Sequence, residues 1–273
     1  AIGHEAGYDL TSGTYNVIMG YQAAYNATTA DNNVAIGRAA IGLGVLTGND
    51  NVAVGYLAGY DLTSGSSNFF GGLRAGQTVT TGADNVAIGQ STLGGAAVTG
   101  NRNIAIGYQA GYDLTSGIYN VFTGYRAGYN ATTGSTNIAI GRQAIGLGVL
   151  TGGNNVVLGY QAGYDLTSGS HNILSGYQSG SNVTTGADNT ILGASAGDVL
   201  TTGSNNIIIG HDAAASATNV SNEITLGDAN ITDVRIPGVG FYIDGGDVGI
   251  GQSSPSAKLD IVGTANETVL EIT

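Results

Sequence analysis

Four aspartates recur at a fixed interval, so the chain can be tested directly for carboxylate chemistry. Each lies 52 positions from the next, and they are Asp9, Asp61, Asp113 and Asp165. Glycoside hydrolysis by two carboxylates requires the groups to be about 5 to 9.5 Å apart. If this interval forms three turns of a stacked β structure, neighbouring members of the set lie about 14 Å apart, which is three strand spacings. We therefore interpret them as solvated turn residues.

Other residues that carry catalytic or metal chemistry are scarce. The three histidines, His4, His171 and His211, are far apart in the sequence and show no metal-binding spacing, and the chain has no cysteine. There is no Gly-x-Ser-x-Gly turn with a plausible order of His and Asp partners, and no phosphate-binding loop with a Lys. The sequence predicts neither an enzyme nor a metal or cofactor site.

Tyrosines recur at two positions, directly after a repeated glycine and four residues further on. Stacked aromatic rings on a rod can bind the faces of sugars. Packing between neighbouring turns of the repeat is the structural alternative. The candidates for contact with a surface glycan are Tyr60, Tyr112, Tyr129 and Tyr164.

Threonines also recur, which raises an ice-binding alternative. Ice binding requires paired threonines on one flat strand, whereas these lie next to glycine turns. The recurring threonines are Thr11, Thr28, Thr63, Thr80, Thr115 and Thr132.

The element that must position all these residues is a five-residue phrase, which we call the anchor. Asn103–Gly107, with the sequence Asn-Ile-Ala-Ile-Gly, is one copy, and the closing glycines recur at steps of about 17 or 18 positions. Every third copy completes a longer period of 52 positions, marked by Tyr-Asp-Leu-Thr-Ser-Gly. A short fixed period predicts a solenoid with one structural unit per repeat. The closing glycines are Gly3, Gly20, Gly37, Gly55, Gly72, Gly89, Gly107, Gly124, Gly141, Gly159, Gly176, Gly193, Gly210 and Gly227.

Alternating side chains in the anchor predict a β-strand, and the frequent glycines argue against helix. A coil of this length has room for two short strands and two turns. We therefore predict a parallel β-solenoid about 60 Å long. The anchor asparagines are expected to form a side-chain ladder from coil to coil.

The middle residue of the anchor is usually alanine but becomes large in every third coil. Because its neighbours on either side are nearly always large, we expect them to fill the coil interior and the middle residue to face partner chains. This assignment predicts apolar layers on a trimer axis, formed by Ile18, Phe70, Phe122 and Leu174.

Composition restricts the partners. Nineteen acidic residues against seven basic ones give a formal charge of -12, which disfavours nucleic acid and anionic membranes. No apolar run approaches the roughly 20 residues of a membrane span. Although Gly is abundant, it lacks the collagen period, and 42% apolar content argues against disorder.

The anchor resembles the heads of trimeric autotransporter adhesins, which are left-handed parallel β-rolls wound as homotrimers. The Gly-Tyr-Gln-Ala-Gly-Tyr corners, from Gly107 and Gly159, and the later Val-Gly-Ile-Gly followed by Ser-Pro-Ser-Ala-Lys-Leu-Asp are more similar to bacteriophage tail-fibre proteins. In that group the closing phrase often precedes an endosialidase-type chaperone. The chain also begins within an anchor, so we expect it to be part of a longer protein.

Together these observations predict an all-β, left-handed, homotrimeric β-roll over residues 1–227, a β-rich neck over 228–245 and a connector over 246–273. The resemblance implies the shaft of a tail fibre, located on the virion outside the cell, whose partners are its own copies and a host cell-surface glycan or protein. The head of a bacterial surface adhesin is the alternative, and an ice- or glycan-binding solenoid is a more distant one.

Overall fold

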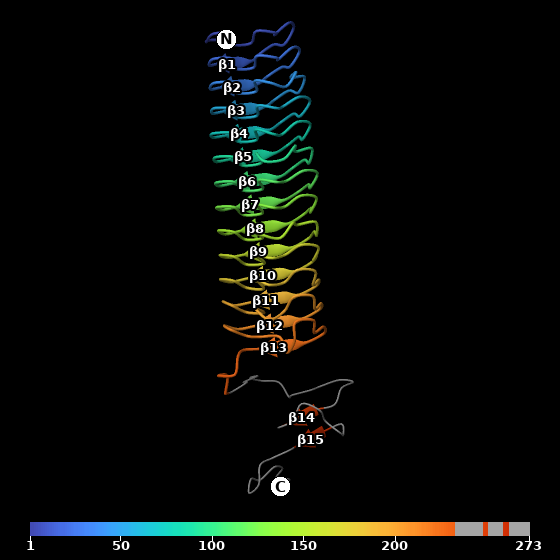
Figure 1. Cartoon of the computed structure of the whole chain (residues 1–273). Helices are drawn as coiled ribbons and strands as arrows, with labels where there is room; N and C mark the ends of the chain where they lie inside the picture. The colour runs from blue at the N-terminus through green and yellow to red at the C-terminus, as the bar shows by residue number, and fades with distance from the viewer. Residues whose placement is uncertain (233–247, 251–258, 262–273) are drawn as a thin grey trace, which may run out of the picture. The chain divides into compact units, whose positions relative to one another are not determined.

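The computed structural model describes residues 1–232, 248–250 and 259–261. The chain divides into two compact units, Ala1–Asn230 and Ile231–Thr273, which are treated separately. The first unit is a regular stack of coils (Figure 1), and it contains every candidate residue introduced above.

Thirteen strands of three residues each form one parallel sheet in the first unit, and their order in the sheet is their order in the chain. The described residues contain no helix. Bonded positions in neighbouring coils are offset by 17 or 18 in the sequence, so the prediction of an all-β parallel solenoid with coils of this length is confirmed. The strands are β1 (Val17–Met19), β2 (Val34–Ile36), β3 (Val52–Val54), β4 (Phe69–Gly71), β5 (Val86–Ile88), β6 (Ile104–Ile106), β7 (Val121–Thr123), β8 (Ile138–Ile140), β9 (Val156–Leu158), β10 (Ile173–Ser175), β11 (Thr190–Leu192), β12 (Ile207–Ile209) and β13 (Ile224–Leu226).

The closing glycine of the anchor is required by both its backbone conformation and its neighbour in the next coil. Gly107 has φ +126°, which L side chains rarely adopt, and a Cβ atom there would lie 2.6 Å from the carbonyl oxygen of Gly124. Because the same contact recurs up the stack, no larger residue fits at this position. The glycine also ends each strand after three residues.

The expectation of two strands per coil is wrong. From β1 to β13 each coil contains one three-residue strand, and the far side is held by backbone bonds that form no strand ladder, such as those from Thr11 N and Ser12 N to Thr28 O at 3.0 and 3.3 Å. Turn glycines and residues with positive φ interrupt the far side every few residues, so no continuous ladder forms there. Isolated bridges such as Val79–Val98 are the nearest equivalent of a second strand.

The assignment of the two strand faces is also wrong, because the interior takes the middle residue. Phe70 and Phe122 are 0% exposed within a single chain, Leu174 is equally buried and Ile18 is 4% exposed. These four side chains fill their own coils and do not face a partner chain. A coil this narrow has room for only one of the three strand side chains, and the alternation of the strand then turns the other two outward.

A three-coil pattern fills the interior, which accounts for the 52-residue period. The ring of Phe122 occupies space left by Gly111 and Gly128, where an added Cβ would lie 2.9 and 2.5 Å from its ring atoms. In the following coil the strand carries Ala139, and the large side chain is the buried Ile145, in the position that corresponds to Gly128. The large side chain thus comes from the strand in one coil and from the corner in the next, opposite glycine in the first case and alanine in the second.

The predicted asparagine ladder is confirmed. Asn120 Nδ2 donates to Asn103 Oδ1 at 3.1 Å and to the Gly134 carbonyl at 2.8 Å. Its Oδ1 accepts from Asn137 N at 2.9 Å, and the pattern repeats along the stack. Because these amides are fully buried, their bonds to one another satisfy groups that water cannot reach.

In the second unit, β14 (Val248–Ile250) and β15 (Leu259–Ile261) form a parallel pair. They lie within the predicted connector. Most of the predicted neck at 228–245 lies outside the described residues, as does the remainder of the connector.

Candidate functional site

The aspartates of the 52-residue period lie in equivalent positions three coils apart. Burial raises the pKa of the Asp61 and Asp113 carboxyl groups above the usual range. The three histidines each lie near one carboxylate, for example His211 Nδ1 at 3.1 Å from Asp212 Oδ2. Within the described residues, no group of three or more histidine, aspartate or glutamate side chains could hold a metal ion.

The hydroxyl groups of the recurring threonines donate hydrogen bonds to backbone carbonyl groups of the next coil. Thr115 Oγ1 donates to the Thr132 carbonyl at 3.0 Å, and Thr167 Oγ1 donates to the Thr184 carbonyl at 3.1 Å. These donors hold neighbouring coils together, so the geometry gives no support to the ice-binding alternative.

The tyrosines that follow the closing glycines form an aromatic and cationic column. The rings of Tyr108 and Tyr125 stack with centroids 5.3 Å apart. The Arg142 guanidinium lies between Tyr125 and Tyr160, at 5.3 and 5.7 Å from their centroids. Because neighbours cover both faces of the inner rings, this column stabilises the stack by cation–π and ring contacts.

A second column is formed by the tyrosines four residues further on, and it is interrupted. The rings of Tyr112 and Tyr129 stack at 5.1 Å with an interplanar angle of 1°. In the third coil of each of the first three 52-residue periods the equivalent residue is glycine, namely Gly42, Gly94 and Gly146. Of the four glycan candidates, Tyr112 and Tyr129 therefore pack on each other, and Tyr60, Tyr129 and Tyr164 each border a gap at a glycine.

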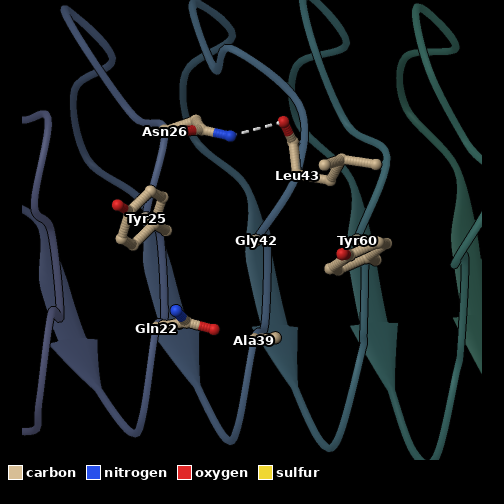
Figure 2. A pocket seen from close by; sticks show the side chains of 7 residues that line it. All are labelled: Gln22, Tyr25, Asn26, Ala39, Gly42, Leu43 and Tyr60. Carbon is tan, nitrogen blue, oxygen red and sulfur yellow. Dashed lines mark hydrogen bonds between the residues drawn. The ribbon is translucent and has the colours of Figure 1, made fainter.

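A pocket of about 210 Å³ lies at the first of these gaps. Figure 2 shows Tyr25 and Tyr60 on either side of Gly42, in three successive coils. The pocket belongs to a corner after the strand, and none of its lining residues is in a strand. It is lined by Gln22, Tyr25, Asn26, Ala39, Gly42, Leu43 and Tyr60.

The pocket arises where a shorter coil meets one that is longer by a single residue. In regular coils the residue after the second tyrosine donates its backbone N–H to the next coil, as from Asp113 to Tyr129 O at 3.0 Å. At the gap a side chain takes over this role, and Asn26 Nδ2 donates to the Leu43 carbonyl at 2.7 Å. The corner bulges there and leaves Leu43 exposed, while the Tyr60 ring reaches toward Gly42, with Cε2 3.0 Å from the position of an added Cβ. In the sequence, the sign of this pocket is a glycine at a position where neighbouring coils carry tyrosine. A turn at this position would explain the glycine equally well.

The equivalent corner two long periods further along the chain carries larger side chains. Gln22 and Ala39 are replaced there by Arg126 and Gln143. The Arg126 guanidinium lies 5.0 Å from the centroid of Tyr129, over the ring that corresponds to Tyr25. The two corners therefore form a natural pair, one open and one filled.

A second candidate is the outward face of the sheet, which we call the outer sheet face. It consists of the first and third residues of each strand, and Ile104 and Ile106 are 38% and 37% exposed. Contiguous exposed apolar surface of this kind marks interaction sites. Its most exposed members are Val17, Met19, Val54, Phe69, Ile88, Ile104, Ile106, Ile138, Ile140, Ile173, Ile207, Ile209, Ile224 and Leu226.

Comparison of the chain with family models, curated proteins and solved structures finds no match. In the part of the chain that the structure describes, no helix has the length and apolarity needed to cross a membrane.

Proposed function

We propose that the chain is the shaft of a bacteriophage tail fibre, built from three copies wound as a left-handed β-roll and located on the virion outside the cell. The observation that carries this proposal is the outer sheet face. Thirteen strands in continuous register place isoleucine and valine side chains outward along the sheet. In a lone chain this apolar surface faces water, which is unfavourable, and identical copies can cover it by packing their sheets together.

The internal bonding supports a mechanical role. Neighbouring coils are joined by backbone bonds and by the buried asparagine ladder. Three copies, rather than two, follow from the resemblance of the anchor to trimeric adhesin heads. Such a shaft needs no catalytic group, and we propose that the chain is not an enzyme.

Light scattering on dilute protein tests the proposal. We expect a mass three times that of the 27.2 kDa chain, together with rods of uniform width in electron micrographs. A folded monomer would contradict the proposal. Incubation with host-surface polysaccharide should release no new reducing ends, and reproducible turnover would show that the chain is an enzyme.

A further inference from the structure

We propose that the pocket between Tyr25 and Tyr60 binds one neutral sugar ring, a pyranose at the surface of a glycan. The site is formed within one chain, so it does not depend on the proposed trimer. Its size suits a single ring, because 210 Å³ lies below the range of about 300 to 1,000 Å³ of pockets for drug-sized ligands.

The geometry of the tyrosine column gives the shape of the ligand. Stacked tyrosines one coil apart, such as Tyr8 and Tyr25, have centroids 5.1 Å apart. Gly42 omits one ring from the column, so two strand spacings, about 9.6 Å, separate the backbones that carry Tyr25 and Tyr60. The Tyr60 ring reaches into this gap, with Cε2 3.0 Å from the position of an added Cβ on Gly42, and a single ring with apolar faces would stack in the pocket between it and Tyr25.

Charge and hydrogen bonding select a neutral ligand with a polar rim. None of the lining side chains is charged, and Glu5 lies nearby, where its Oε2 accepts from Gln22 Nε2 at 2.8 Å. Desolvation and the neighbouring Glu5 carboxylate raise the pKa of Tyr25, which further favours the neutral hydroxyl. Within the described part of the chain, Gln22 Oε1 and Asn26 Oδ1 accept no hydrogen bond and are available to ring hydroxyls. A pyranose matches this lining because its ring C–H groups are apolar and its rim carries hydroxyls.

The filled corner supplies a matched control. Ala39→Gln places in the pocket the residue that the chain already carries at Gln143, with the same positive φ, so the variant is expected to fold. The reverse change, Arg126→Gln with Gln143→Ala, opens the second corner. Its gap is bordered by Tyr129 and Tyr164, as the first is by Tyr25 and Tyr60.

The test is saturation-transfer NMR of the intact chain with neutral methyl glycopyranosides, glucuronate and phenol as probes. We expect methyl glycosides to bind with a Kd on the order of 1 mM, because a ligand of about a dozen heavy atoms gains little more. Glucuronate should bind more weakly. Ala39→Gln should weaken binding of the glycosides by at least about tenfold, and adding Arg126→Gln and Gln143→Ala to that variant should restore it.

Two results would overturn the inference. Unchanged binding in Ala39→Gln would show that this pocket is not the site, and transfer to phenol without transfer to any glycoside would exclude a sugar. Neither result bears on the shaft proposal, which depends on the outer sheet face. Circular dichroism of each variant checks that it is folded.

Discussion

The ring of Phe122 lies so close to Gly128 of the adjoining corner that a Cβ atom on Gly128 would be 2.5 Å from Phe122 Cδ1. The two positions are linked, because the phenyl ring needs the space that the missing side chain leaves. Where the strand residue is alanine, as at Ala139, the opposite wall carries the buried Ile145. The interior of a coil thus has room for a large side chain either from the strand or from the opposite corner, but not from both.

The first prediction concerns this packing. Phe122→Ala should lower the free energy of unfolding by about 3 to 5 kcal/mol, because a buried ring is removed and the coil cannot collapse around the cavity. Tyr125→Ala removes an exposed ring and should cost about 0.5 to 1.5 kcal/mol through lost stacking. Denaturant unfolding of both variants makes the comparison. Equal losses would show that the interior assignment of Phe122 is incorrect.

The asparagine ladder leads to the second prediction. Asn120→Ala leaves the Gly134 carbonyl and Asn137 N without their partner, whereas Asn103 Oδ1 keeps the bond from the backbone N–H of residue 120. Each buried group left unsatisfied costs about 1 to 3 kcal/mol, so the variant should be strongly destabilised.

Asn120→Asp tests the effect of a buried charge separately from the loss of hydrogen bonds. Burial raises the pKa of the introduced carboxyl group above its unfolded value. The loss of stability caused by Asn120→Asp should therefore grow as the pH rises from the unfolded pKa through the folded pKa, and shrink on acidification. Thermal melting at several pH values checks this, with Asn120→Ala as the control whose deficit stays constant. A deficit in Asn120→Asp that does not depend on pH would count against a buried ladder.

A third prediction follows from Asp61, whose folded pKa is raised by burial. The folded state disfavours the ionised form of Asp61. Asp61 therefore lowers the free energy of unfolding as the pH rises from the unfolded pKa through the folded pKa, and it has no such effect below both values. Asp61→Asn should therefore melt about 1 °C higher at neutral pH, an effect kept small because the side chain is only partly buried. At about pH 3 the two proteins should melt together. A lower melting temperature for Asp61→Asn at neutral pH would contradict this account.

The coil architecture could be predicted from the sequence because the anchor repeats in nearly every coil. Gly107 recurs because the turn that ends the strand requires glycine, and Asn103 recurs because its side chain is part of the hydrogen-bonded ladder. Both roles could be predicted from the repeat. The face of the strand could not be assigned from alternation alone, since alternation shows that Ile104 and Ile106 share a face but not which face is inside. Assigning it required the width of the coil, which depends on where the far wall lies.

Sequence reasoning missed the pocket for a related reason. Gly42 fits a turn on its own, and nothing in a single repeat shows that its neighbours in the adjacent coils are Tyr25 and Tyr60. Tyr112 and Tyr129 are glycan candidates because tyrosine recurs at the same position of successive coils. The same recurrence stacks their two rings on each other.

The central claim is that the outer sheet face joins identical chains, and single cysteines test it most directly because the chain has no cysteine of its own. We expect Ile106→Cys, on that face, to form disulfide-linked dimers on mild oxidation, because the proposed packing of outer sheet faces places copies of this residue next to one another. Ser116→Cys, exposed in a turn outside the strand, should remain unlinked under the same conditions. Efficient dimer formation by Ile106→Cys, with only monomer from Ser116→Cys, is the predicted result, and equal or absent crosslinking at Ile106 would contradict the account.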